Sequence, residues 1–170
     1  MTAPVPIIRQ NGEGERFWFA GGGVFTMKAS APETGEAFTL VEDEVAKGKT
    51  TPLHLHPDFD EAIYVLEGEI LAYVNDEEHP VGERGIFVAP RGVPHAFLVV
   101  SDRARLLVVQ TPGTGEAFYR DSSEPLISED DVSRPADFAR LRAVAERSPS
   151  IELLGPPPFA SLRPEQAAVN

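Results

Sequence analysis

The chain has 170 residues, a hydrophobic content of 42% and a formal net charge of -12. A chain of this length can build one sizeable hydrophobic core, so we expect one globular unit. The acidic balance argues against a nucleic-acid partner, because phosphate binding requires a basic surface. The sequence contains no cysteine, which excludes disulfides and thiolate metal ligands.

The beginning of the chain shows no targeting signal. Residues 1–10 have neither the basic start nor the apolar stretch of a secretory leader. No apolar run approaches the roughly eighteen residues that a membrane span requires. We therefore expect a cytoplasmic protein without a membrane partner, in which residues 1–14 form a lead-in to the fold.

Short apolar segments separated by glycine, proline and polar turns fill the chain from residue 17 to residue 110. The 14 glycines and 16 prolines suit a protein of many short strands. Asn75 and Asp76 lie between two apolar segments and predict a hairpin turn. After Glu61 both alternating positions are apolar, which predicts a strand with two covered faces. The predicted strands are 17–20, 24–29, 37–45, 51–56, 61–67, 70–74, 86–89, 95–100 and 105–110.

Strands this short and this close, with no helix between them, favour a closed barrel or a sandwich, which we assign to residues 15–112. After Pro112 the composition changes, and residues 115–120 can form one or two helical turns. A clearer helix is predicted from Ser133 as the cap, with Pro135 in its first turn, through Arg147. Its apolar residues share one face, so residues 113–170 are expected to be a helical segment and tail that pack on the barrel.

Three of the four histidines fall close to one glutamate along the predicted strands. His54 and His56 are two residues apart, so on an extended strand both rings point to one face. Glu61 precedes an apolar run, where an inward carboxylate needs a partner such as a metal. His95 follows the rigid turn 90–94 and supplies a third imidazole. His79 lies in a polar stretch and is expected to be an ordinary surface residue.

Imidazole nitrogen and carboxylate oxygen suit a divalent first-row metal, so this pattern predicts one metal ion held by His54, His56, Glu61 and His95. Four protein ligands leave one or two coordination positions open on a five- or six-coordinate metal, as in a catalytic site. The sequence does not select among nickel, iron, manganese, zinc, cobalt and copper.

The intervals G-x5-H-x-H-x4-E-x6-G from Gly48 to Gly68, followed by PRGVPH at 90–95, resemble the two signature motifs of the cupin superfamily. The resemblance covers about residues 17–112. It implies an all-β fold, a small antiparallel jelly-roll barrel, here with short C-terminal helices, that binds one divalent metal inside. The second motif departs at Arg84, where glycine is usual, and at Val99, where asparagine is usual. These departures bear on local turn geometry more than on metal binding.

The finer pattern is similar to that of single-domain cupins of the bacterial quercetin 2,3-dioxygenase type. The segments that carry it are FWF at 17–19, PLHLH at 52–56, EAIYVLEG at 61–68, PRGVPHAF at 90–97 and TPG at 111–113. The resemblance implies a metal-dependent dioxygenase that uses O2 on a small aromatic or enolisable substrate, with Glu61 as metal ligand and catalytic base. Phe25, Met27, Tyr64 and Phe97 are candidates for the substrate pocket, with ordinary barrel core as the alternative interpretation.

A non-oxidative role stays open, because the same metal site can serve an isomerase or a small-molecule binding or sensing protein. Inward arginine or lysine residues would indicate an anionic ligand. The strands near the metal motifs carry few cations, with Lys28 as the exception, which favours an apolar, uncharged substrate. A structural or storage role is weaker, because such a barrel does not need an acid beside two histidines.

Barrels of this kind are commonly dimeric, so by analogy we expect a homodimer. The aromatic residues 17–19 are predicted to form an edge strand, and an exposed aromatic edge is a liability unless it is covered. Either a second subunit or the tail 151–170 is expected to cover it.

Overall fold

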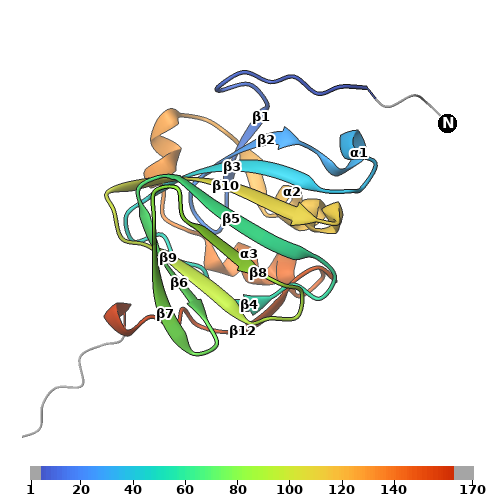
Figure 1. Cartoon of the computed structure of the whole chain (residues 1–170). Coiled ribbons are helices and arrows are strands. Elements are labelled where there is room, and N and C mark those ends of the chain that lie inside the picture. Colours follow the sequence, from blue (N-terminus) through green and yellow to red (C-terminus); the bar gives the residue numbers. More distant parts are fainter. Residues whose placement is uncertain (1–4, 163–170) are drawn as a thin grey trace, which may run out of the picture.

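The computed structural model describes residues 5–162, which fold into two antiparallel β-sheets (Figure 1). The larger sheet has seven strands in the order β11-β1-β2-β3-β10-β5-β8, and the smaller has five in the order β12-β4-β9-β6-β7. The predicted all-β jelly roll is therefore confirmed.

The strands of the larger sheet are β1 (Glu15–Phe19), β2 (Val24–Ala29), β3 (Thr39–Ala46), β5 (Asp60–Glu67), β8 (Ile86–Ala89), β10 (Arg103–Thr111) and β11 (Ser123–Pro125). Those of the smaller sheet are β4 (Leu53–Leu55), β6 (Glu69–Val74), β7 (Glu77–Gly82), β9 (His95–Val99) and β12 (Glu152–Gly155). The helices are α1 (Ala31–Thr34), α2 (Glu116–Asp121) and α3 (Phe138–Ala145), with 3-10 turns at η1 (Gly113–Gly115), η2 (Glu129–Ser133) and η3 (Ala160–Leu162).

Alternation along β5 decides which of its side chains face the interior. Glu61, Ile63 and Val65 are buried, whereas Ala62 and Tyr64 on the other face are half-buried. Successive residues of a strand point to opposite faces, so the inner face of β5 carries the carboxylate of Glu61 toward the core. The sequence predicted that both faces of this strand are covered. The inner face is buried as predicted, whereas the outer face is only half-buried.

All nine predicted strands appear, with small shifts of their ends, whereas α1, β7, β11 and β12 were not predicted. The predicted strand at 51–56 is shorter, because only Leu53–Leu55 keeps strand geometry. The hairpin prediction is confirmed: Asn75 (φ 52°) and Asp76 (φ 63°) join β6 to β7, both in the left-handed region that two-residue hairpins require. His79 lies in β7 and is half-exposed.

The departure from the second cupin motif has a clear structural consequence. Arg84, which stands where glycine is usual, has a φ of 65°. Glycine is favoured there because it enters the left-handed region at little cost. The arginine therefore adopts a left-handed backbone conformation that glycine would enter at less cost.

The segment after residue 112 adds strands to both sheets. The helical turns predicted at 115–120 correspond to α2. The predicted start of the second helix at Ser133 is wrong, because Ser133 ends η2 and α3 begins only at Phe138. Asp137 supplies the cap, since its side chain accepts a hydrogen bond from the backbone nitrogen of Arg140 at 3.0 Å.

The aromatic strand β1 is not an edge strand. It pairs with β11, in a register that sets Trp18 opposite Glu124 and Phe19 opposite Ser123. The expectation that a partner subunit or the tail covers β1 is therefore wrong for the described residues. The late segment β12 pairs instead with β4 in the smaller sheet.

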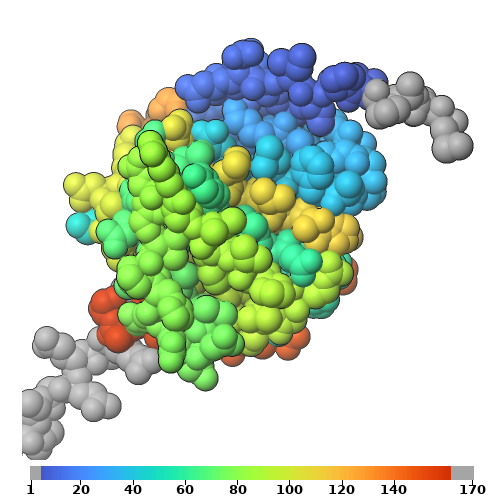
Figure 2. Space-filling model, in the orientation of Figure 1, coloured from blue at the N-terminus to red at the C-terminus, as the bar shows by residue number. Residues whose placement is uncertain are grey.

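The N-terminal segment lies on the surface beside β1 and β2 (Figures 1 and 2). Lys28 Nζ attaches it to β2, donating to the carbonyl oxygens of Gln10 at 3.1 Å and Glu13 at 3.0 Å. Within residues 5–162, no helix has the length and apolar content needed to cross a bilayer.

Candidate metal site and internal cavity

The two sheets bring His54, His56, Glu61 and His95 together, all of them buried, with one donor atom from each within 4.8 Å of the others. His54 lies in β4 opposite His95, the first residue of β9, and His56 directly follows β4. Glu61 faces them from β5 in the larger sheet. The cluster is therefore built where the two sheets approach each other, from segments that the sequence separates.

Backbone carbonyls fix the orientation of all three imidazoles. The Nδ1 atom of His54 lies 2.8 Å from the Pro52 oxygen, that of His95 lies 2.8 Å from the Val93 oxygen, and that of His56 lies 3.1 Å from the Ser150 oxygen. A carbonyl oxygen only accepts hydrogen bonds, so each Nδ1 carries the proton. The Nε2 atoms are then free to bind a metal.

The Nε2 atoms of His56 and His95 are buried and have no hydrogen-bond partner among the described residues. Nε2 of His95 lies 3.5 Å from Glu61 Oε2, and Nε2 of His56 lies 3.8 Å from Glu61 Oε1. Donors that share one metal, each at about 2.0–2.2 Å, lie at most about 4.4 Å apart, and both of these distances are within that limit. The donor set and its spacing fit a divalent metal, which would give these orphaned nitrogens a partner.

Two further side chains orient the carboxylate of Glu61. Gln110 Nε2 and the Tyr119 hydroxyl each donate to Oε1 at 3.1 Å. Thr39 holds Gln110 in turn, because its hydroxyl donates to Gln110 Oε1 at 3.1 Å. Oε2 receives neither of these bonds and is the oxygen turned toward His95.

The buried charges shift the pKa values of these groups. Burial raises the pKa of Glu61, but the close approach of the His56 and His95 rings outweighs it and holds the pKa well below its usual value. Burial, followed by repulsion from His95 and His56, lowers the pKa of His54 to about 3. Burial and the Glu61 carboxylate raise the pKa of Tyr119 well above its usual value, so its hydroxyl remains a donor.

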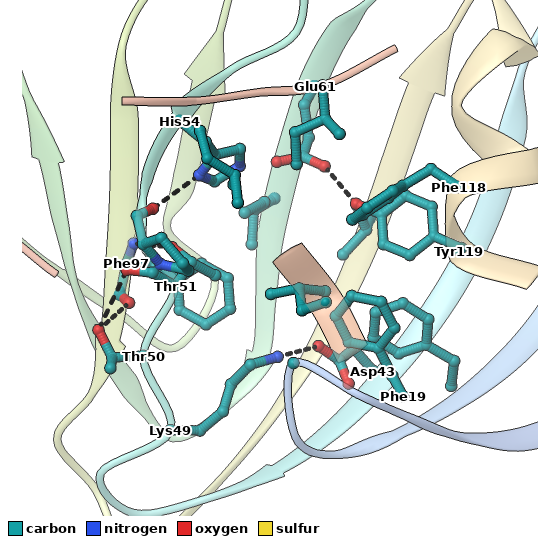
Figure 3. A pocket seen from close by; sticks show the side chains of 18 residues that line it. Phe19, Asp43, Lys49, Thr50, Thr51, His54, Glu61, Phe97, Phe118 and Tyr119 are labelled. Carbon is teal, nitrogen blue, oxygen red and sulfur yellow. Dashed lines mark hydrogen bonds and ion pairs between the residues drawn. The ribbon is translucent and has the colours of Figure 1, made fainter. Parts of the chain in front are cut away.

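A cavity of about 50 Å³ adjoins the cluster, bounded at one end by His54 and Glu61 and at the other by Asp43 and Lys49 (Figure 3). Its walls are largely aromatic and aliphatic. They are formed by Phe19, Phe25, Ile63, Phe97, Val108, Phe118, Tyr119, Leu141, Ile151 and Leu153, with Gly21, Thr50, Thr51 and Pro52.

Two of the four predicted pocket residues line this cavity and two do not. Phe25 and Phe97 line this cavity. Met27 is buried in the main core and does not line it. Tyr64 lies on the outer face of β5, opposite Ile86 of β8. It is an odd number of residues from the inward-facing Glu61, and successive side chains of a strand point to opposite faces.

Several polar residues of the cavity were not predicted, among them Asp43, Lys49 and Tyr119. Lys28 was predicted as the cation near the site, but it holds the N-terminal segment instead. The buried cation that faces the cavity is Lys49. Position 49 directly follows Gly48 of the first motif, which is the only sequence signal that could have pointed to it.

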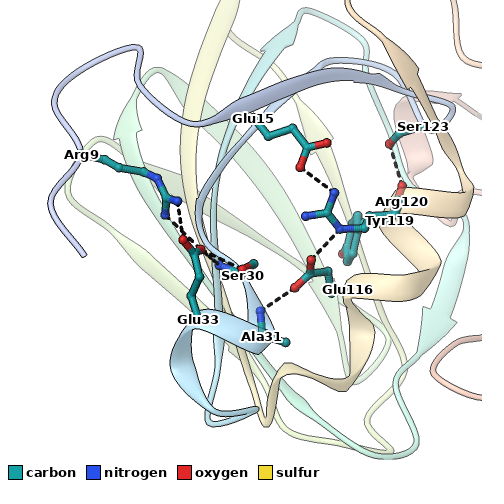
Figure 4. A network of polar contacts seen from close by, with 9 residues as sticks. All are labelled: Arg9, Glu15, Ser30, Ala31, Glu33, Glu116, Tyr119, Arg120 and Ser123. Atoms are coloured by element: carbon teal, nitrogen blue, oxygen red, sulfur yellow. Dashed lines mark hydrogen bonds and ion pairs between the residues drawn. The ribbon is translucent and has the colours of Figure 1, made fainter. Parts of the chain in front are cut away.

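The helix that carries Tyr119 is anchored by a polar network (Figure 4). Glu116, at the start of α2, accepts hydrogen bonds from the Ala31 nitrogen at 2.5 Å and from Arg120 Nε at 2.6 Å. Arg120 also pairs with Glu15 of β1 at 2.6 Å. These contacts hold α2 against α1 and β1, so that Tyr119 is kept over the cavity.

Known proteins resemble this chain in both sequence and structure. Residues 41–110 match a family model described as Cupin domain. Over 149 residues the chain is 32% identical to quercetin 2,3-dioxygenase of Bacillus subtilis (strain 168), an alignment that covers 84% of this chain and 44% of that protein. The chain thus spans less than half the length of this curated relative.

Two solved structures share the fold. KdgF from Halomonas sp. has a TM-score of 0.54 at 19% identity, covering 61% of this chain and 90% of that one. An RmlC-like cupin from Shewanella frigidimarina NCIMB 400 has a TM-score of 0.56 at 19% identity, covering 64% and 92%. At these identities the likeness concerns the fold alone.

Proposed function

Because the chain belongs to the cupin superfamily, we propose that it is a metal-dependent dioxygenase of the quercetin 2,3-dioxygenase type, acting on a small aromatic or enolisable substrate. His54, His56, Glu61 and His95 would hold one divalent transition metal. The observation that carries the proposal is the pair of buried, unpartnered Nε2 atoms beside an oriented carboxylate and an apolar cavity. The similarity to a quercetin 2,3-dioxygenase supports the choice of reaction.

When bound, such a metal supplies Lewis acidity that lowers the pKa of an enol hydroxyl. The protein's own part is to place the substrate and to move its proton. Oε1 of Glu61 is held by Gln110 and Tyr119, so Oε2 is the atom that accepts the enol proton. The aromatic walls of the cavity position a planar substrate and exclude water.

The test is aerobic incubation of metal-reconstituted protein with a panel of flavonols and single-ring enols, following both substrate loss and O2 uptake. We expect both signals in the wild type and neither in Glu61→Gln at equal protein concentration. Absence of substrate loss and of O2 uptake across the panel, in protein shown by elemental analysis to carry metal, would refute the dioxygenase proposal.

The second candidate is a non-oxidative cupin, an isomerase or a small-molecule binding or sensing protein that uses the same metal site. The observation that favours it is Lys49, because an inward cation indicates a ligand with a polar end. Binding or isomerisation of a ligand under anaerobic conditions, with no O2 uptake when air is admitted, would select this candidate.

We also propose that the protein is a homodimer. The edge strand β8 carries the exposed side chains of Ile86 and Val88, whose exposed fractions are 59% and 50%. They lie opposite Tyr64 and Ala62 on the outer face of β5. An apolar edge of this kind can continue its sheet with the same edge of a second copy. Light scattering tests this, and a monomeric mass at micromolar concentration would contradict it.

A further inference from the structure

A buried ion pair closes the end of the cavity remote from the histidine cluster. Lys49 Nζ lies 3.2 Å from Asp43 Oδ2, and the two side chains are only 7% and 3% exposed. Figure 3 shows both side chains across the cavity from His54 and Glu61. The cavity therefore has two polar ends joined by an apolar middle.

Both members of this ion pair have hydrogen-bonding capacity that the described residues do not use. The ammonium of Lys49 has three N–H donors, and Asp43 Oδ2 is the one acceptor found for them in residues 5–162. Asp43 Oδ1 is buried and has no hydrogen-bond partner in the same part of the chain. Buried polar groups are nearly always partnered, so these free positions indicate a ligand or water.

Aromatic rings surround the ammonium and limit what can approach it. Nζ lies 5.0 Å from the ring centre of Phe97, 5.7 Å from that of Phe19 and 5.8 Å from that of Phe25. These cation–π contacts hold Lys49 in the cavity. The cavity volume of about 50 Å³ is far below the roughly 300–1,000 Å³ of pockets that bind drug-sized molecules. It is also below the roughly 150 Å³ of a cavity that accepts benzene, so even a single-ring ligand requires the walls to move apart.

The net charge of the pair selects the chemistry of the ligand. Lys49 and Asp43 neutralise each other, so a carboxylate ligand would place a second buried negative charge beside one ammonium, which is costly. A hydroxyl group suits both partners, because its oxygen accepts from Lys49 and its hydrogen is donated to Asp43.

We propose that Asp43 and Lys49 form a second recognition point, which binds an uncharged hydroxyl group on a small, single-ring ligand whose other end reaches the histidine cluster. This inference rests on the metal site proposed above and names the substrate class of that site. It also makes the pair the specificity-determining element of the cavity.

Three hydroxypyranones test the proposal, because they share one metal-binding hydroxyketone and differ at one ring position. Allomaltol carries a methyl group there, kojic acid a hydroxymethyl group and comenic acid a carboxylate. Binding to nickel-loaded protein, dialysed free of excess metal, is measured by calorimetry. We expect kojic acid to bind about tenfold more tightly than allomaltol, the usual gain from a hydrogen bond to a charged group, and comenic acid to bind more weakly than kojic acid.

Two variants separate recognition from structural support. In Asp43→Leu/Lys49→Met, which removes both charges, kojic acid and allomaltol are expected to bind equally, with allomaltol affinity within about twofold of the wild type. In Asp43→Asn, where the pair becomes cationic, comenic acid is expected to bind more tightly than kojic acid. Metal content and the fluorescence of Trp18, which is buried, confirm that each variant is folded and loaded.

Equal binding of kojic acid and allomaltol to the wild type would overturn the proposal. So would a preference for kojic acid that survives in the double variant, or failure of all three compounds to bind loaded protein. O2 uptake is recorded separately: selective binding of kojic acid without O2 uptake on any substrate refutes the dioxygenase and leaves this inference standing. Failure to take up nickel, seen by elemental analysis, refutes the metal site and the inference with it.

Discussion

Replacing Lys49 by methionine removes the cation that pairs with the buried carboxylate of Asp43 while keeping most of the side-chain volume. At pH 7.5 we expect Lys49→Met to lower the free energy of unfolding by about 3–5 kcal/mol, because it leaves an uncompensated buried charge. The double variant Asp43→Leu/Lys49→Met should recover most of this loss, since a buried pair replaced by apolar groups of similar size is close to neutral.

The pH dependence of the free energy of unfolding tests the Asp43–Lys49 ion pair in a second way. Burial, partly offset by Lys49, raises the pKa of Asp43 from 3.8 to about 6. The folded state therefore holds this proton more tightly than the unfolded chain does. A shift of this size contributes about 3 kcal/mol of stability that is fully present below pH 4 and is lost as pH rises through 6. The cost of Lys49→Met should accordingly be smaller at pH 5 than at pH 7.5.

Urea unfolding followed by fluorescence measures both effects, because Trp18 is the one tryptophan of the chain and is 1% exposed. The three proteins are compared at pH 5 and pH 7.5 with equal ionic strength. Equal losses in the single and double variants would show that pairing with Lys49 does not stabilise Asp43. A loss in Lys49→Met that is independent of pH would show that the carboxyl group does not titrate in this range.

Three further substitutions test the support of the site. Glu61→Gln is expected to lower metal affinity at least about tenfold without loss of fold, and unchanged metal content would contradict its role as a ligand. Tyr119→Phe removes one donor to Glu61 and should weaken metal binding about 10–100-fold in competition with a chelator, whereas an unaltered affinity would show that the hydroxyl does not orient the carboxylate. Gly115→Ala would set a methyl group 2.6 Å from Gln110 Oε1 and is expected to cost about 1–3 kcal/mol in urea unfolding. Gly155→Ala, which meets nothing within 4 Å, is the matched control, and equal stability of the two variants would contradict the steric reasoning.

Local spacing allowed the four cluster residues to be predicted, because each lies at or next to a strand end whose pattern is visible. His54 and His56 share a strand face, and Glu61 follows the alternation of β5. Tyr64 was assigned to the pocket as an aromatic residue near the motif, although it has the opposite parity to Glu61. Strand period rather than residue type decides which side chains face inward.

Residues that reach the cavity from distant segments could not be predicted. Asp43 lies in β3 and Tyr119 in α2, and only the folded sheet brings them near β5. The short strands β11 and β12 were missed because three or four residues, one of them Pro125 and another Gly155, show no alternation. The start of α3 depends on a cap at Asp137, four residues after the serine that the sequence favours.

The position of β12 makes the proposed metal ligands depend on the order of synthesis. This strand is among the last parts of the described chain, yet it pairs with β4, which carries His54, and the carbonyl of Ser150 just before it fixes the ring of His56. A chain still on the ribosome without these residues can form much of both sheets but lacks the partner that sets the His56 tautomer. Competence to capture a metal ion should therefore arise only after residues 150–155 have emerged and β12 has paired with β4.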